Sequence, residues 1–101
     1  MKPIAVPQGE QFLEADLNEC CRDIAACVTV NVTQGQMDAL ISFVFNLGGG
    51  ALASSTLLHE LNGGNLAAAA DQFPLWVHGA NKQVLPGLVA RRAWERTQFL
   101  M

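Results

Sequence analysis

Residues 32–50 read VTQGQMDALISFVFNLGGG and predict a helix with a defined start, a buried face and a defined end. Thr33 suits the N-terminal cap and Gln36 follows three residues later, so the pair forms a capping box that satisfies two free backbone N–H groups. Gly48 is the expected end of the helix. Apolar residues at helical spacing predict its buried face: Met37, Leu40, Ile41, Val44 and Leu47.

The end of this helix has a composition that packing alone does not require. Phe45, a large aromatic residue, stands beside Asn46, and the three glycines 48–50 follow. Glycine-rich chain costs conformational entropy to order, so the combination predicts a surface kept for a ligand. The alternative is that Phe45 belongs to the core and Asn46 caps the helix.

The chain on either side of this stretch predicts more helices. Leucines, cysteines and other apolar residues recur at helical spacing over residues 10–28, which indicates one amphipathic helix. Residues 28–32 have a strand-like composition but no partner strand, and we interpret them as an extended connector. A serine or threonine at 54–56 is expected to cap a short helix that Gly63 and Gly64 end.

The C-terminal third continues the helical pattern. Asn65 is expected to cap a helix over residues 66–73, and Pro74 then forces a bend. Residues 78–85 form a loop, and Pro86 suits the first turn of the last helix. The sequence therefore predicts a compact all-α bundle of about five helices. Residues 1–8 would be an N-terminal extension, and residues 9–101 one helical domain.

Composition limits the function classes that fit a chain of 101 residues. Half of the residues are hydrophobic and 15% are charged, which disfavours disorder. The net charge of −3 disfavours a broad nucleic-acid interface. The first seven residues contain two prolines, and no apolar run approaches the length of a membrane span. We expect a soluble chain made in a cytoplasm.

The three cysteines do not suggest a disulfide or a metal site. Cys20, Cys21 and Cys27 share one predicted helix, in which Cys20 and Cys27 would lie roughly 10 Å apart, too far for a disulfide. His59 and His78 have no ligand spacing to them. We interpret the cysteines as small hydrophobic residues in a reducing environment and expect no metal and no cofactor.

Four blocks of sequence resemble the phage-type lysozymes, the endolysins that act as muramidases on bacterial peptidoglycan. The blocks stand in family order at family spacing, and the resemblance runs from about residue 9 to the C-terminus: TQGQMDALISFVFNLG, STLLHELNGG, AAAADQFPLWV and LPGLVARRAWERTQFL. The resemblance implies the helical lobe of a lysozyme. It also implies metal-independent hydrolysis of the β-1,4 bond between N-acetylmuramic acid and N-acetylglucosamine.

The same resemblance implies that Phe45 and Asn46 lie on the floor of a saccharide cleft. An aromatic face stacks on sugar C–H groups, and an amide both donates to and accepts from hydroxyl and N-acetyl groups. Trp76 is a second candidate for a cleft wall, with closure of the core as its alternative. Ser55 and Thr56 are candidates for contact with a glycan hydroxyl, although helix capping alone explains them and is the favoured interpretation.

In the last helix, the resemblance implies that Arg91 or Arg92 faces a catalytic glutamate across the cleft. A third arginine that often precedes this pair in the family is Ala90 here, so the match leaves both candidates open. The alternative is that one of the two arginines pairs with Glu95 on the helix surface, since they are separated by four and three residues.

No residue of the chain matches the catalytic positions of the family. Those positions lie in an N-terminal β-rich segment that carries a glutamate, an aspartate and a threonine, and the acids over residues 10–23 have ordinary helix-surface spacing. We therefore assign no catalytic residue and expect a truncated lobe, with an exposed apolar patch near Phe45.

Three interpretations follow from this expectation. The chain is an endolysin whose catalytic segment is missing, a peptidoglycan-binding module that does not cleave, or a lobe that docks on a complementary lysozyme lobe or on itself. In each case the expected partner is a peptidoglycan glycan strand, with no nucleic acid and no membrane span. Synthesis is expected in the bacterial cytoplasm, and the target lies in the periplasmic cell wall.

Overall fold

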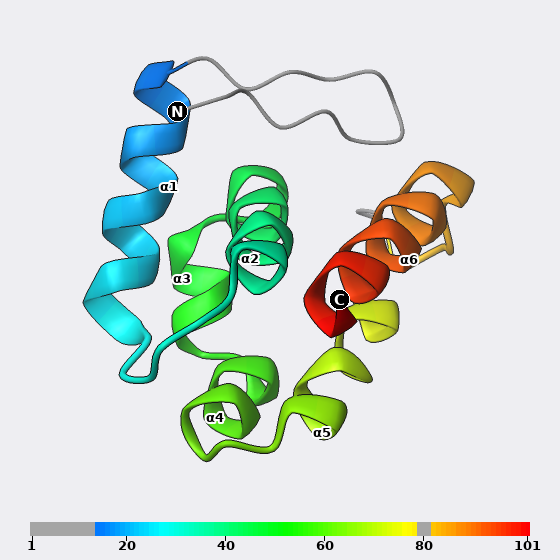
Figure 1. Ribbon diagram of the computed structural model, residues 1–101. Helices are drawn as coiled ribbons and strands as arrows, with labels where there is room; N and C mark the ends of the chain where they lie inside the picture. The colour runs from blue at the N-terminus through cyan, green and yellow to red at the C-terminus, as the bar shows by residue number, and fades with distance from the viewer. Residues whose placement is uncertain (1–13, 79–81) are drawn as a thin grey trace.

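The protein is an all-α domain in the computed structural model, which describes residues 14–78 and 82–101 (Figure 1). Its elements in chain order are α1 (Glu14–Cys27), α2 (Gln34–Leu47), α3 (Gly49–Ala53), α4 (Thr56–Asn62), α5 (Leu66–Ala70), the 3₁₀ helix η1 (Phe73–Leu75) and α6 (Pro86–Leu100). Within these residues there is no β-strand, and an isolated antiparallel bridge joins His78 to Val84. The predicted fold class is confirmed. The predicted N-terminal extension, residues 1–8, lies outside the described residues.

Helix α2 is the central element and forms as the sequence predicts. Thr33 Oγ1 accepts a hydrogen bond from Gln36 N at 3.1 Å, and Gln36 Oε1 accepts one from Thr33 N at 2.8 Å, which completes the capping box. Gly48 ends the helix with φ of 95° and donates its N–H to Val44 O. Figure 1 shows α2 between α1 on one side and α6 on the other, and both helices pack against it.

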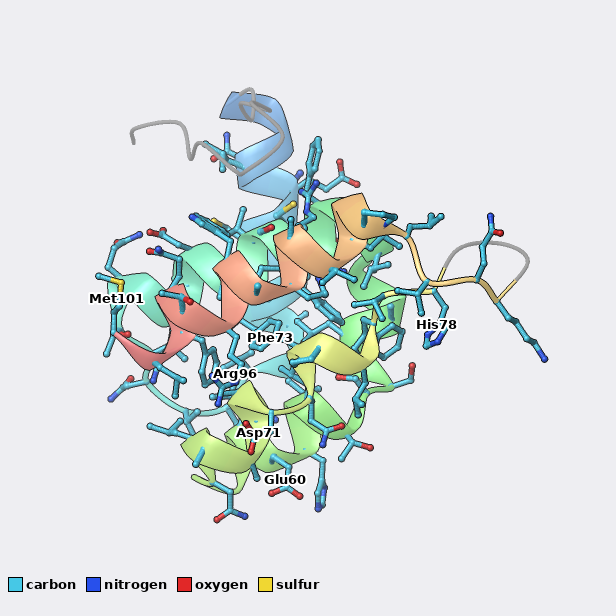
Figure 2. All side chains as sticks on the ribbon, turned by 90° about the vertical axis from the view of Figure 1, so that its right-hand side faces the viewer. Glu60, Asp71, Phe73, His78, Arg96 and Met101 are labelled. Atoms are coloured by element: carbon cyan, nitrogen blue, oxygen red, sulfur yellow. The ribbon has the colours of Figure 1, made fainter. Side chains whose placement is uncertain are left out.

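The core lies where α1, α2, α4, α5 and α6 converge. Phe73 packs against Phe43 with ring centroids 5.8 Å apart and against Phe99 at 5.4 Å. All three rings are buried, and Figure 2 shows Phe73 in the interior between the C-terminal helices. Burial of a large apolar side chain contributes about 1.5–3 kcal/mol, so these rings supply much of the energy that holds η1 and α6 on α2.

Short polar contacts fix the outer segments to this core. Asn62 Oδ1 accepts from Thr29 N at 2.9 Å, and Asn62 Nδ2 donates to Cys27 O at 3.0 Å, so the connector after α1 is held by α4. That connector contains neither helix nor strand. Arg96 on α6 pairs with Asp71 after α5 at 3.0 Å (Figure 2). This pair is exposed and contributes less than about 1 kcal/mol.

Helix α3 was not predicted from the sequence. Gly49 and Gly50 were expected to belong to a surface kept for a ligand, and in the structure they begin helix α3. Glycine disfavours helix by about 1 kcal/mol per residue. Leu52, two residues further on, is completely buried in the core. Burial of this leucine outweighs the low helix propensity of the glycines, so tertiary packing forms α3.

Two boundaries in the C-terminal half also differ from the expectation. Asn65 occupies the N-cap position of α5 but makes no side-chain cap, because its amide donates to Glu60 Oε2 at 3.0 Å instead. Helix α5 ends at Ala70 rather than residue 73, because the chain tightens into η1 around Pro74. Pro86 stands at the start of α6, as predicted.

Two further predictions concern the cysteines and membrane spans. No disulfide joins Cys20, Cys21 and Cys27 to one another, and Cys20 is buried. In the part of the chain that the structure describes, no helix has the length and apolar character needed to cross a bilayer.

Candidate functional site

The C-terminal end of α2 exposes the two residues that the sequence singled out. Phe45 is 40% exposed, whereas Phe43, two residues earlier, is fully buried. Asn46 is exposed as well. The alternative role of Asn46 as the helix cap is taken by Gly48, whose N–H bonds Val44 O at 2.7 Å. An exposed ring and an exposed amide therefore lie next to each other on one helix end.

Arg91, Arg92 and Glu95 of α6 form a buried ion cluster against α2, close to this helix end. The expected arginine–Glu95 pair forms, but it is not on the helix surface, because Glu95 and Arg92 are 0% exposed and Arg91 is 3% exposed. Arg92 Nη2 donates to Glu95 Oε2 at 2.7 Å, and Arg92 Nε lies 2.6 Å from Oε1 without an aligned hydrogen bond. Ser42 Oγ donates to the same Oε2 at 2.5 Å.

The two arginines have different neighbours. The Arg91 guanidinium lies over the Phe45 ring, 5.9 Å from its centroid. The Arg92 guanidinium lies over the buried Phe43 ring at 5.4 Å and donates to Trp76 O at 3.5 Å. Arg91 is thus the arginine beside the exposed helix end, while Arg92 supports the core. This difference separates two candidates that the sequence could not distinguish.

Burial governs the titration of the cluster. Desolvation raises the pKa of Glu95, and the charges of Arg92 and Arg91 and the hydrogen bond from Ser42 partly offset the increase. Desolvation likewise lowers the pKa of Arg92, and the Glu95 carboxylate opposes this change. A fully enclosed carboxylate that is bound by an arginine and a serine does not reach a polymer at the surface, so Glu95 has a structural role.

Trp76 and the two hydroxyl candidates lie in different surroundings. The indole of Trp76 is half-buried and packs edge-on against Phe43 at 5.3 Å. Ser55 is buried, accepts from Leu58 N at 3.1 Å and donates to Leu52 O at 2.7 Å. Ser55 is therefore confirmed as the cap of α4, and its hydroxyl already both donates and accepts a hydrogen bond. Thr56 is exposed at the first position of α4.

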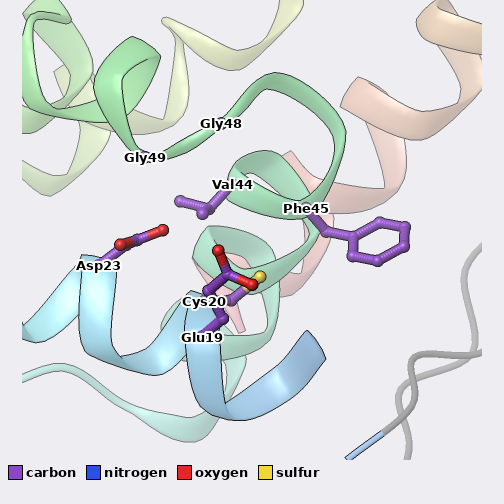
Figure 3. Close-up of a pocket in the computed structure, with 7 residues that line it drawn as sticks. All are labelled: Glu19, Cys20, Asp23, Val44, Phe45, Gly48 and Gly49. Atoms are coloured by element: carbon purple, nitrogen blue, oxygen red, sulfur yellow. The ribbon is translucent and has the colours of Figure 1, made fainter. Parts of the chain in front are cut away.

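A pocket of about 280 Å³ opens beside this helix end (Figure 3). Helix α1 brings two carboxylates, Glu19 and Asp23, to one side of it, and Val44 faces it from α2. The full lining is Glu19, Cys20, Asp23, Val44, Phe45, Gly48 and Gly49. Within the described residues, no group of three or more metal-binding side chains is present.

The pocket carboxylates Glu19 and Asp23 have the spacing of ordinary surface acids, so the sequence did not single them out. Both are exposed, as that spacing predicts. However, Glu19 and Asp23 are four residues apart on the side of α1 that faces α3, and a Cβ added at Gly49 would lie 2.8 Å from the Asp23 carboxyl carbon. The only sequence signal is that the two acids flank Cys20, a residue of the buried face.

Comparisons with known proteins agree with the helical architecture. A family model described as phage lysozyme matches residues 1–95. The chain is similar to an endolysin of Bacillus phage B103, with 46% identity over 97 residues, and to an endolysin of Salmonella phage P22, with 39% identity over 97 residues. Each alignment covers 96% of this chain, but 36% of the first relative and 65% of the second. The chain therefore spans about a third to two thirds of the length of these relatives.

Solved structures of lysozyme-like proteins also share this helical fold. The muramidase domain of SpmX from Asticaccaulis excentricus superimposes with a TM-score of 0.82 at 29% identity, over 99% of this chain and 86% of that chain. A P22 lysozyme mutant superimposes with a TM-score of 0.80 at 40% identity, over 87% of this chain and 59% of that chain.

Proposed function

The chain belongs to the phage lysozyme family, and we propose that its helices form one wall of a cleft that binds the glycan strand of bacterial peptidoglycan. The observation that carries this proposal is the exposed Phe45–Asn46 pair at the end of α2. In a helix whose other aromatic residue is fully buried, a partly exposed phenylalanine beside an exposed amide offers the two contacts that an N-acetylated sugar needs.

Each candidate residue has a distinct role in this proposal. The Phe45 ring stacks on the apolar face of a sugar, and the Asn46 amide hydrogen-bonds an N-acetyl or hydroxyl group. Trp76 offers the accessible part of its indole as a second contact, while its packing on Phe43 limits its movement. Thr56 is the exposed hydroxyl candidate, because Ser55 is occupied in capping.

The reaction proposed for the whole lysozyme is hydrolysis of the β-1,4 bond between N-acetylmuramic acid and N-acetylglucosamine. This reaction needs a general acid and usually a second carboxylate close to the scissile bond. Among residues 14–78 and 82–101, Glu95 is enclosed in its ion cluster and does not fit that role. Because no residue of the sequence matches the family's catalytic positions, we propose that the acid belongs to a segment outside the described residues, and that the helices contribute binding and orientation.

Glycan binding without cleavage is the second candidate function. It is favoured by the contrast between the exposed Phe45–Asn46 pair and the enclosed Glu95 carboxylate. Adding the purified chain to chloroform-treated Gram-negative cells and following turbidity separates the two functions. Loss of turbidity indicates hydrolysis, whereas stable turbidity together with retention on murein indicates binding alone.

Binding itself is tested by a murein pull-down. Asn46→Ala is expected to reduce retention several-fold, because it removes a paired donor and acceptor. Asn31→Ala is the matched control, since Asn31 is an exposed asparagine in the connector before α2. Equal retention of the wild type and Asn46→Ala would remove the cleft argument. Docking on a complementary lobe, or self-association, stays a prediction that light scattering of the purified chain tests. The proposed site of action is the cell wall.

A further inference from the structure

We infer that Ser42, Arg91 and Glu95 are positioning residues that hold the Phe45 ring in the orientation used for glycan binding. The inference rests on the proposed function, because it takes Phe45 as the ring that contacts sugar. The three residues act through Phe45, since Ser42 and Glu95 are 0% exposed and Arg91 is 3% exposed.

The geometry of α2 places Ser42 and Phe45 on one face. They are three residues apart, so their side chains are neighbours along the helix surface. Arg91, on α6, lies against both. Its guanidinium carbon is 5.9 Å from the centroid of the Phe45 ring, and its Nε lies 3.2 Å from Ser42 Oγ. A cation in this position attracts the ring face and favours one ring orientation.

Contacts with Ser42 and Glu95 hold the Arg91 guanidinium in place. Nε donates to Ser42 Oγ, Nη2 donates to Ser42 O at 3.4 Å, and Glu95 Oε2 lies 3.7 Å from Nε. Two of these contacts reach α2, and the third stays within α6. Rotation of the guanidinium away from Phe45 would break these contacts in a buried setting, where unsatisfied polar groups are costly.

Ser42 has the central place because a hydroxyl both donates and accepts. Its Oγ donates to Glu95 Oε2 at 2.5 Å and accepts from Arg91 Nε at 3.2 Å. Alanine would remove both bonds at once. Arg92 also binds Glu95, but its guanidinium lies over Phe43 and donates to the backbone of Trp76 rather than contacting Phe45. The positioning path to the exposed ring therefore runs through Arg91.

The test compares Ser42→Ala with Ser55→Ala in the full chain. Both variants remove a buried serine hydroxyl, but Ser55 contacts α3 and α4 rather than Arg91. Two quantities are measured by NMR: the ring-proton shifts of Phe45 without ligand, and the affinity for a tetramer of N-acetylglucosamine. Ser42→Ala is expected to shift the ring protons and weaken binding about fivefold, and Ser55→Ala is expected to change neither.

A second variant covers the case in which Ser42→Ala does not fold. Arg91→Lys keeps the positive charge but loses the planar fork that Ser42 binds, and the same ring-proton shift and weaker binding are expected. Unchanged ring shifts and affinity in the folded Ser42→Ala or Arg91→Lys protein would overturn the inference. Equal changes in Ser55→Ala would also overturn it, since loss of stability alone would then explain the result.

Failure of the proposed function has a different signature. If the wild type does not bind the tetramer, the glycan-binding proposal is wrong. The positioning of Phe45 is then decided by the ring-proton shifts alone, which need no ligand. A shift in Ser42→Ala and not in Ser55→Ala supports the positioning role, and the absence of that shift refutes it.

Discussion

Replacing Arg92 with methionine is expected to destabilise the protein by about 3–5 kcal/mol near neutral pH, because it leaves the Glu95 carboxylate buried without its main partner. Both side chains are 0% exposed, and Arg92 Nε lies 2.6 Å from Glu95 Oε1. Unit charges about 4 Å apart attract by roughly 4 kcal/mol at an effective dielectric constant of about 20. Methionine replaces the unbranched apolar stem of arginine but not the guanidinium, so most of the loss is expected to reflect the missing charge and its hydrogen bonds.

The size of this loss is expected to depend on pH. Burial raises the pKa of Glu95 and Arg92 opposes the increase, so removing Arg92 raises that pKa further. A carboxyl group with a raised pKa in the folded state favours folding fully below its unfolded pKa, and this contribution is lost as pH rises through the folded pKa. The destabilisation by Arg92→Met is therefore expected to be smaller near pH 4 than near pH 7.

Urea unfolding followed by circular dichroism at the two pH values measures both effects. The double variant Arg92→Met/Glu95→Leu removes both charges and is expected to lie within about 1 kcal/mol of the wild type. Arg96→Met is the matched control, because the Arg96–Asp71 pair is 43% and 66% exposed and contributes less than about 1 kcal/mol. A loss below about 1 kcal/mol for Arg92→Met near pH 7, or an equal loss at both pH values, would refute the reasoning.

Three further predictions concern the helices around the site. Gly35→Ala is expected to lower the free energy of unfolding by about 1–3 kcal/mol although alanine favours helix, because the new Cβ would overlap the Gln98 carbonyl oxygen on α6. Gly50→Ala has open space around the new Cβ and is expected to raise the free energy of unfolding by about 0.4–1 kcal/mol. Denaturant unfolding of the two variants checks these opposite signs. Thr33→Ala is expected to cost about 1 kcal/mol, because the capping box is lost, and a thermal melt that coincides with the wild type would contradict this. Burial raises the pKa of the Cys27 thiol, so its alkylation by iodoacetamide near pH 8 is expected to be slower than that of a small free thiol; an equal rate would argue against the shift.

The helices that the sequence predicted correctly have short-range signals. The Thr33–Gln36 capping box, Gly48 at the end of α2 and Pro86 at the start of α6 all appear in the structure as expected. Each signal acts within one turn of helix, so neighbouring residues are enough to define it. The exposure of Phe45 and Asn46 also agrees with the interpretation of the aromatic, the amide and the glycines as a surface feature.

Features that depend on packing between helices were not predictable in the same way. Helix α3 begins with two glycines, which have low helix propensity, and it forms because Leu52 is buried in the core. Glu19 and Asp23 reach the pocket beside Phe45 because α1 packs on α2 and α3, and the sequence does not specify that pairing.

The sequence by itself determined the all-α class, the ends of α2 and the start of α6. Tertiary structure alone decided that Arg91, Arg92 and Glu95 are buried, and that Arg91 rather than Arg92 lies against Phe45. Charged residues three and four apart have the same spacing on an exposed helix as in a buried cluster. The two cases differ in the neighbouring helix, because Ser42 and Phe43 of α2 supply the hydroxyl and the ring that allow these charges to be enclosed.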